Sequence, residues 1–243
     1  MQLQGKAALV TGGGSGIGLG IALALAREGC RVAISGRDGR KLEEAARQFD
    51  GRPAMVSRSC DVTDRDGVGD LVAWTIEQLG PLDIVVNSAG INVARRKMCE
   101  LDPADFDRLL AVNCTGLYNV LYAVLPGMRQ RRDGLIVSIC SISGKRAHPL
   151  GGPGYCASKF GAAGLATAVG LEERPNGIRI TSIHPGEAET PILAHRPVPV
   201  PAEQRARMLH PADIAACVVT LAKLPPNVVV PELIITPAYQ EYL

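Results

Sequence analysis

Aromatic side chains are scarce in this chain, at 4% of its 243 residues with a single tryptophan. Apolar residues still make up 47% of the sequence, and most of them are small or aliphatic. That bias suits a sheet buried between helices, because small side chains let the layers approach closely. It also provides enough apolar material for a core covered on two faces.

An excess of charge of one sign is also lacking. The formal net charge is +2 at pH 7, which is too slight to indicate nucleic acid or a membrane surface as a partner. No run reaches the roughly 18 apolar residues of a transmembrane helix, and the first residues lack the apolar stretch of a secretory signal. We therefore expect a cytoplasmic protein that binds neither nucleic acid nor membrane.

Cysteine and histidine show no ligand spacing. The seven cysteines are scattered, odd in number and without a C-x-x-C pair, and the four histidines share no metal-binding interval. This excludes a disulfide framework or a zinc site as a reading of the pattern. We expect reduced cysteines and no metal.

Short β-branched runs alternate regularly with longer helical stretches. Strands are predicted at 6–10, 31–35, 54–59, 82–87, 134–140, 178–183 and 229–235, and helices at 17–27, 39–49, 64–79, 103–128, 153–173 and 211–223. Asp64 is expected to cap the third helix. The alternation predicts a single α/β domain over 1–243, a doubly wound, Rossmann-like parallel sheet with helices on both faces. A proline-rich stretch at about 187–209 is expected to cover the substrate as a lid.

A glycine-rich turn, T-G-G-G-S-G-I-G, occupies 11–18 between the first predicted strand and helix. Glycines here permit positive φ and let backbone amides approach a phosphate at the positive end of the helix. The spacing is G-x-x-x-G-x-G rather than G-x-G-x-x-G. The alternative is a turn that merely requires small residues.

The joint pattern resembles the short-chain dehydrogenase/reductase family. The marks that carry the resemblance run from the first strand to about Thr190: T-G-x-x-x-G-I-G at 11–18, Asp61, N-S-A-G at 87–90, Asn113, Ser141, Y-C-A-S-K at 155–159 and P-G-E-A-E-T at 185–190. Ser88 and Ala188 depart from the more usual N-N-A-G and P-G-x-V-x-T. The resemblance implies a nicotinamide-dependent oxidoreductase that moves hydride between the cofactor and a carbonyl or alcohol carbon of a small substrate.

The same resemblance implies the residues that bind the cofactor. Asp61 and Val62 would lie against adenine, although Asp61 can also be read as a turn or cap acid. Thr190 and the backbone of Ala188 would hold the carboxamide. The full implied set is Gly12, Ser15, Gly16, Ile17, Gly18, Arg37, Asp61, Val62, Asn87, Ala89, Gly90, Tyr155, Lys159, Pro185, Gly186, Ala188 and Thr190.

Cofactor choice depends on the end of the second predicted strand. Folds that prefer NAD usually place an acid there to accept the ribose hydroxyls, but this chain has Gly36 followed by Arg37. Arg37 can form a charge-assisted bond to a 2′-phosphate, so we favour NADP(H), with NAD(H) as the alternative. Arg37 can also stack on adenine, face solvent or pair with Asp38. Ser15 stands where relatives often have a second basic residue, which weakens the preference.

Four residues carry the implied catalysis: Asn113, Ser141, Tyr155 and Lys159. Tyr155 and Lys159 are four residues apart on one helical face. A free phenol has a pKa near 10, and a neighbouring ammonium favours its phenolate, so Tyr155 can serve as general acid in reduction and general base in oxidation. Lys159 is also expected to reach the nicotinamide ribose.

Ser141 follows the fifth predicted strand, where its hydroxyl can hydrogen-bond the substrate oxygen in the transition state. Its rivals are Ser138, which is expected to point elsewhere on the strand, and Ser143, because the interval from Ser141 to Tyr155 is one residue longer than usual for the family. Asn113, by resemblance, holds a water that touches the lysine. Its other reading is a side chain that secures the backbone of a neighbouring strand.

Further features leave alternatives open. Arg196 and Arg205 on the lid either meet an anionic substrate or face solvent. The tail lacks the family's common D-G-G ending, and relatives usually pair through the helices at 103–128 and 153–173, which implies a homodimer or homotetramer.

The alternatives in function are an NAD-preferring dehydrogenase, another reaction of the family such as epimerisation or dehydration, and a dinucleotide-sensing regulator without catalysis. All four catalytic positions are filled, which argues against the regulator.

Overall fold

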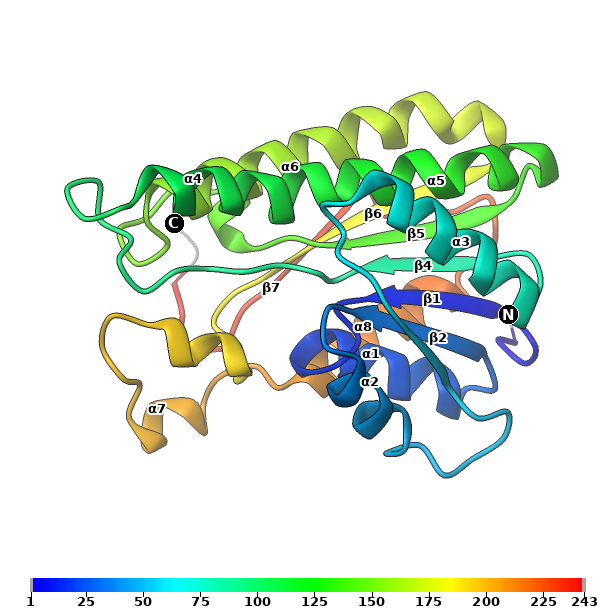
Figure 1. Cartoon of the computed structure of the whole chain (residues 1–243), viewed down its shortest axis with the longest axis horizontal. Helices are drawn as coiled ribbons and strands as arrows, with labels where there is room; N and C mark the ends of the chain where they lie inside the picture. The colour runs from blue at the N-terminus through cyan, green and yellow to red at the C-terminus, as the bar shows by residue number, and fades with distance from the viewer. Residues whose placement is uncertain (1, 242–243) are drawn as a thin grey trace.

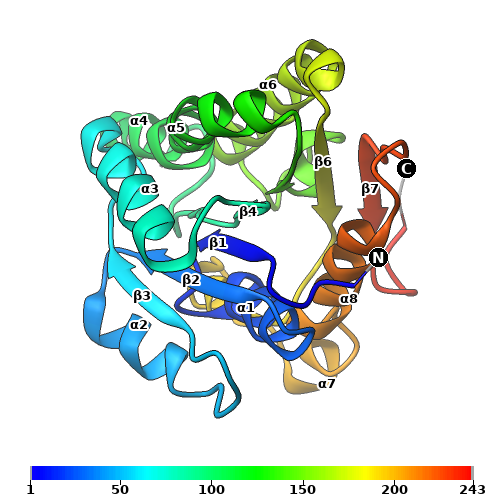
Figure 2. The ribbon, with the colours of Figure 1, turned by 90° about the vertical axis from the view of Figure 1, so that its right-hand side faces the viewer.

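Seven parallel strands form one sheet in the computed structural model, which describes residues 2–241. The strand order is β3-β2-β1-β4-β5-β6-β7, and every neighbouring pair is parallel (Figure 2). The bounds are β1 Ala7–Thr11, β2 Arg31–Gly36, β3 Val56–Ser59, β4 Ile84–Asn87, β5 Gly134–Ile139, β6 Ile178–Pro185 and β7 Glu232–Ile235. The predicted doubly wound α/β fold is confirmed.

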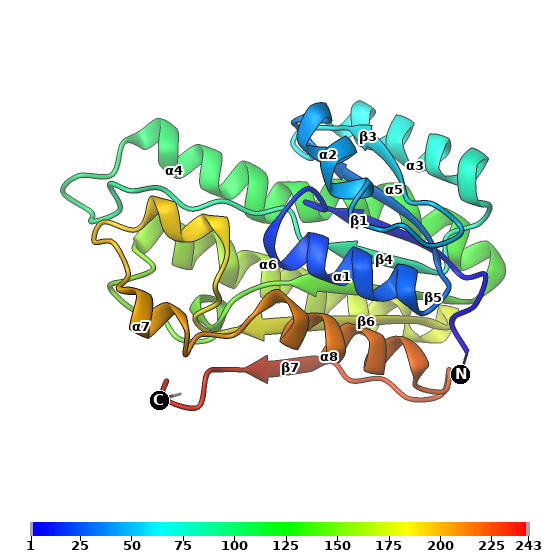
Figure 3. The same ribbon diagram turned by 90° about the horizontal axis from the view of Figure 1, so that it is seen from below.

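Helices cover both faces of this sheet (Figures 1 and 3). One layer holds α3 Arg65–Leu79, α4 Pro103–Leu110, α5 Gly116–Arg131 and α6 Pro153–Glu173, and the other holds α1 Gly16–Arg27, α2 Gly39–Ala46 and α8 Pro211–Lys223. Side chains of β1 alternate between two cores: Leu9 packs toward the α3–α5–α6 layer and Val10 toward the α1–α8 layer. Because both faces are covered, the strand is apolar throughout rather than alternating.

Most predicted boundaries agree with the structure, and α6 and α8 agree at both ends. Asp64 caps α3 as expected, since its side chain accepts a hydrogen bond from the amide of Gly67 at 3.2 Å. The last strand is predicted to begin at 229, whereas β7 begins at Glu232. The residue before it, Pro231, has no N–H to donate to a neighbouring strand. Helix α2 ends at Ala46, three residues short of the prediction.

The helix expected at 103–128 is interrupted by a π-helical turn at Ala111–Thr115 and continues to Arg131. Such turns insert one extra residue and are frequent at functional sites. By length and composition the stretch Pro103–Arg131 is apolar enough to cross a membrane, but 56% of its most apolar window is buried inside this fold. It packs between α3 and α6, so its apolar face serves the core.

The strand order reverses between β1 and β4, which opens a crevice at the carboxyl ends of the strands. The lid lies over that edge and contains a short 3₁₀ turn at Pro191–His195 and the helix α7 Ala202–Arg205. Figures 1 and 3 show it at the end of the molecule where the strands point. Ala188 pairs with Leu209 where the lid leaves and rejoins the fold.

Candidate active site

A cleft of about 370 Å³ opens at the carboxyl edge of the sheet, beneath the lid. Of the nineteen residues implied to bind the cofactor or to act in catalysis, thirteen line this cleft: Gly12, Ser15, Gly16, Ile17, Gly18, Gly90, Ser141, Tyr155, Lys159, Pro185, Gly186, Ala188 and Thr190. The other six lie outside its lining: Arg37, Asp61, Val62, Asn87, Ala89 and Asn113. Within residues 2–241 no group of three or more His, Cys, Asp or Glu side chains is placed to hold a metal, and the seven cysteines are unpaired.

The turn between β1 and α1 requires glycine at defined points. Gly12 has φ +67°, and a Cβ there would lie 2.8 Å from the Ser88 carbonyl. A Cβ on Gly18 would lie 2.3 Å from the carbonyl oxygen of Gly12. Ser15 precedes α1 and its side chain makes no capping hydrogen bond, so the first amides of α1 are not taken by a cap. A helix N-terminus of this kind suits a phosphate, and the turn therefore fits the pyrophosphate of a dinucleotide.

Asn87 supports the cleft from below. It is 4% exposed and its Oδ1 accepts a hydrogen bond from the Thr11 hydroxyl at 2.8 Å. The Thr11 hydroxyl in turn accepts from the amide of Ala89 at 3.4 Å. This chain of bonds ties the ends of β1 and β4 together, while Ser88 reaches the cleft lining.

Helix α6 presents Tyr155 and Lys159 to the cleft on one face. The Nζ of Lys159 lies 5.7 Å from the centroid of the Tyr155 ring and donates to the carbonyl oxygen of Ile139 at 3.2 Å. Lys159 is buried, at 5% exposure. A Cβ on Gly90 would lie 3.4 Å from this Nζ, so glycine leaves the space above the ammonium open.

The two candidate serines differ in what their hydroxyls already contact. Ser143 is buried, and its Oγ lies 2.9 Å from Nε2 of His148. Ser141 is half-buried and its Oγ accepts from the amide of Ser143 at 3.1 Å, which leaves its own hydroxyl hydrogen for a ligand. Both line the cleft, and Ser141 is the more exposed of the two.

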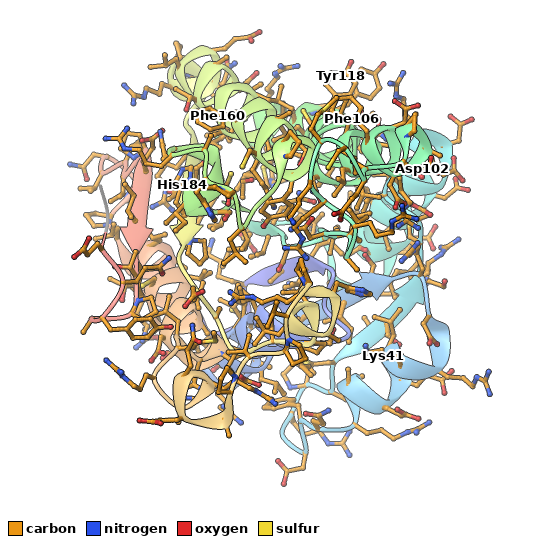
Figure 4. All side chains as sticks on the ribbon, turned by 90° about the vertical axis from the view of Figure 1, so that its left-hand side faces the viewer. Lys41, Asp102, Phe106, Tyr118, Phe160 and His184 are labelled. Atoms are coloured by element: carbon orange, nitrogen blue, oxygen red, sulfur yellow. The ribbon has the colours of Figure 1, made fainter. Side chains whose placement is uncertain are left out.

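Two histidines that the sequence pattern did not indicate support these serines. His184, labelled in Figure 4 near the end of β6, is fully buried, with Nδ1 3.0 Å from the carbonyl oxygen of Ser141. Burial lowers the pKa of His184 and also that of His148. Both rings are therefore neutral at neutral pH, and His184 donates from Nδ1 to hold the backbone that carries Ser141.

Asn113 lies in the π-helical turn and points toward the loop after β4. Its Oδ1 accepts from the amide of Ile91 at 2.8 Å, and its Nδ2 donates to the Ile91 carbonyl at 3.0 Å and to Ser158 Oγ at 2.9 Å. These bonds show the side chain securing a neighbouring backbone, and the other reading, a bound water that touches the lysine, stays a prediction compatible with it.

Arg37, Asp61 and Val62 lie at the other end of the crevice, near β2 and β3. Asp61 accepts from the amide and hydroxyl of Thr63 at 2.9 and 2.8 Å, as a turn acid does. Val62 is 6% exposed and packs on Gly116, where a Cβ would lie 2.7 Å from it. Arg37 is exposed, and the carboxylate of Asp38 caps α2 by accepting from the amide of Lys41 at 3.2 Å.

Both lid arginines pair with a glutamate but differ in exposure: Arg205 is exposed to solvent, as one expectation had it, whereas Arg196 is mostly buried and lines the cleft. Arg196 donates to Glu187 at 2.8 Å with its side chain only 14% exposed, and Arg205 forms an ion pair with Glu189. Their partners, Glu187 and Glu189, come from the P-G-E-A-E-T segment at 185–190, where the lid begins. Each of the two arginines therefore has a glutamate of the protein as its ion-pair partner.

The tail after β7 returns to the site. Tyr239 donates its hydroxyl to Glu187 at 2.5 Å, and Gln240 accepts from the amide of Glu187 at 2.8 Å while lining the cleft. Burial acts to raise the pKa of Glu187, but the hydrogen bonds from Tyr239 and Arg196 outweigh it and hold the pKa below its ordinary value. The departure from D-G-G thus coincides with a tail that buttresses the lid.

Comparison with known proteins places these features in a family. Residues 6–198 match the family model for short chain dehydrogenases. Among curated relatives, the chain is 36% identical to glycine betaine reductase of Emericella nidulans over 97% of its own length, although it spans only 19% of that longer protein. It is 31% identical to the 3-oxoacyl-acyl-carrier-protein reductase of Thermotoga maritima over 81% of this chain and 80% of that one.

A solved structure of the same fold supports this family assignment. The alcohol dehydrogenase of the archaeon Thermococcus sibiricus, complexed with 5-hydroxy-NADP, superimposes with a TM-score of 0.87 at 30% identity, covering 98% of this chain and 99% of that one. The chain belongs to the short-chain dehydrogenase/reductase family and is an NAD(P)-dependent oxidoreductase.

Proposed function

We propose that this enzyme is an NADP(H)-dependent carbonyl reductase or alcohol dehydrogenase acting on a small substrate. One observation carries the proposal: a phenol, a buried ammonium and a serine hydroxyl meet in one cleft, beside a glycine turn shaped for a pyrophosphate. Tyr155, Lys159 and Ser141 all line this cleft together with Gly12 and Gly16.

The nicotinamide cofactor, when bound, supplies or accepts the hydride. In reduction, the Ser141 hydroxyl donates to the substrate oxygen, on which negative charge develops. Tyr155 gives its proton to the same oxygen, and the ammonium of Lys159, 5.7 Å from the phenol ring, stabilises the phenolate left behind. Asn113 holds the loop at Ile91, and His184 holds the Ser141 backbone, so the donors stay in place.

The preference for NADP(H) over NAD(H) is supported by the space and charge around β2. A Cβ on Gly36 would find its nearest neighbour, Leu42, at 3.6 Å, so the position is open and carries no acid. Arg37 is exposed beside it, and Lys41, labelled in Figure 4, belongs to the adjoining first turn of α2. These cations suit a 2′-phosphate. The Thermococcus relative was solved with an NADP derivative.

The decisive experiment is Tyr155→Phe. We expect kcat to fall by about 10²–10⁴-fold while the Kd for NADPH stays within about twofold, because the phenol is needed for proton transfer rather than for cofactor binding. Turnover is followed by NADPH absorbance with a panel of ketones, aldehydes and alcohols. Tyr122→Phe, on the exposed face of α5, is the matched control. Retention of full activity by Tyr155→Phe contradicts the assignment.

We also propose assembly as a homodimer or homotetramer through the α5 and α6 faces, in the cytoplasm. Tyr118, Tyr122 and Phe160 are exposed on these helices, and Figure 4 shows Tyr118 and Phe160 on the outer helical layer. Light scattering on the purified chain is expected to give two or four times the mass of 25.6 kDa. A monomeric mass contradicts this.

A further inference from the structure

We propose that Arg96 is a subsite for a substrate carboxylate, so that the substrates of this enzyme are small oxo or hydroxy acids. The proposal rests on the proposed function, since it names the substrate class of the same cleft. Arg96 lies in the loop after β4, is 6% exposed, and lines the cleft with Tyr155.

The guanidinium of Arg96 joins three segments that surround the substrate space. Its Nε donates to the carbonyl of Val93 at 2.8 Å in its own loop, its Nη1 to the carbonyl of Leu150 at 2.9 Å before α6, and its Nη2 to the carbonyl of His195 in the lid. A guanidinium has five N–H donors, so two are left by these three carbonyls. Two N–H groups on a planar cation match the two oxygens of a carboxylate.

A buried cation ordinarily has an acidic partner, because removing a charge from water is costly. Within residues 2–241 Arg96 contacts carbonyl oxygens only and forms no ion pair. Burial lowers the pKa of Arg96, and the nearby positive charge of Arg196 lowers it further. The site therefore holds a positive charge that the protein itself leaves uncompensated.

Three of the other basic groups that line the cleft are engaged within the protein or neutral, and the fourth, His195, is exposed. Arg196 donates to Glu187 at 2.8 Å, and Lys159 donates to Ile139 next to the phenol of Tyr155. Burial lowers the pKa of His148, which keeps that ring neutral at neutral pH. Among the residues that the structure describes, Arg96 is thus the buried arginine without an acidic partner that an anionic substrate group meets when the carbonyl end lies at Tyr155 and Ser141.

The test measures binding without turnover. Butyrate and its neutral analogue butyramide are titrated into the NADP⁺-loaded protein by calorimetry. We expect the wild type to bind butyrate about ten- to hundredfold more tightly than butyramide, as charge-assisted hydrogen bonds imply. Arg96→Met is expected to abolish that ratio by weakening butyrate alone, and Arg96→Lys to restore part of it. Arg95→Met removes the same charge from the exposed neighbouring residue and is expected to leave the ratio unchanged.

Two results overturn the inference: a wild type that binds the two ligands equally, or an Arg96→Met variant that weakens both by the same factor. The second result assigns Arg96 to loop structure alone, and the Kd for NADP⁺ and the Tm of each variant identify a general loss of fold. The binding ratio is independent of chemistry. If Tyr155→Phe stays active while the ratio holds, the proposed function fails and the carboxylate subsite stands. If the enzyme reduces neutral ketones but binds butyrate and butyramide equally, the carboxylate subsite fails and the proposed function stands.

Discussion

Arg37 lies at the end of β2, exposed, beside the open space left by Gly36. Asp38 was one candidate partner for it, but that carboxylate instead accepts the amide of Lys41 at the start of α2. This leaves Asp38 engaged with the helix backbone, which is compatible with the proposed contact of Arg37 to a 2′-phosphate. A single side chain can set the choice of cofactor here, because the 2′-phosphate distinguishing NADP from NAD is one doubly charged group.

For Arg37→Ala we expect KM for NADPH to rise about tenfold or more, with KM for NADH changed by less than about twofold. The reason is the loss of a charge-assisted hydrogen bond that only the phosphate receives. Steady-state kinetics with both cofactors measures it. Arg40→Ala, an exposed arginine three residues on, serves as control. An unchanged ratio of the two KM values refutes the phosphate role.

Several site residues were predictable because they lie in local motifs. Tyr155 and Lys159 share one helix, and the glycine turn is a continuous segment, so spacing along the chain reflects geometry. Arg96, His148 and His184 were not predictable in this way. Arg96 meets carbonyls 54 and 99 residues away, and His184 meets one 43 residues away. Such contacts exist only once the sheet has brought its loops to one edge.

Helices α5 and α6 lie side by side in Figure 1 and are joined by an ion pair between a partly exposed arginine and a buried glutamate. Arg129 donates to both carboxylate oxygens of Glu173, whose side chain is 1% exposed. Asn176 donates to the same carboxylate at 2.9 Å. The hydrogen bond from Arg129 lowers the pKa of Glu173 below its ordinary value. The pair therefore stabilises the fold above the ordinary pKa of about 4.3 and is lost as the pH falls through the folded value.

Glu173→Gln is expected to lower the free energy of unfolding by about 1–2 kcal/mol at pH 7, a value reduced by the exposure of the arginine to solvent. That corresponds to a fall in Tm of about 2–8 °C for a chain of this size. Differential scanning calorimetry measures it. Glu172→Gln removes a neighbouring exposed carboxylate and should leave Tm within about 1 °C. If Glu173→Gln and Glu172→Gln lowered Tm by the same amount, the ion pair between Arg129 and Glu173 would add no stability of its own.

At this scale the sequence indicated the helices well but not their irregularity. The apolar periodicity predicts one helix at 103–128, whereas the structure inserts a π-helical turn at Ala111–Thr115. A π-helical turn has no distinctive residue composition, and Asn113 has an apolar residue on each side, so the sequence pattern does not reveal the turn. The turn is held by tertiary contacts, since Asn113 is bonded to Ile91 and Ser158 from other segments.

The whole molecule is expected to lose stability under mild acid through two histidines, the buried His184 and the half-buried His148. Burial lowers the pKa of both His148 and His184, so the folded chain binds fewer protons than the unfolded chain. Stability is then full above the ordinary histidine pKa of about 6.5 and falls as the pH drops below it. The carboxylates with lowered pKa act only at more acidic pH.

We expect Tm to be at least about 2 °C lower at pH 5.5 than at pH 7.5, and the difference to shrink in His184→Asn. Thermal unfolding at matched ionic strength checks this. His195→Asn, an exposed histidine in the lid, is expected to keep the wild-type difference. A difference that is unchanged in both His184→Asn and His148→Asn would assign the acid sensitivity to other groups.

By itself the sequence determined the succession of strands and helices along the chain, the parallel sheet and the glycine-rich turn that suits a phosphate. These follow from periodicity, from glycine at positions such as Gly12, and from motifs confined to single segments. Only the tertiary structure decided which charges stay unpaired in the cleft. Whether an arginine such as Arg196 or Arg96 finds a carboxylate depends on distances between segments far apart in the chain, and that distance is set by packing of the whole sheet and its helices.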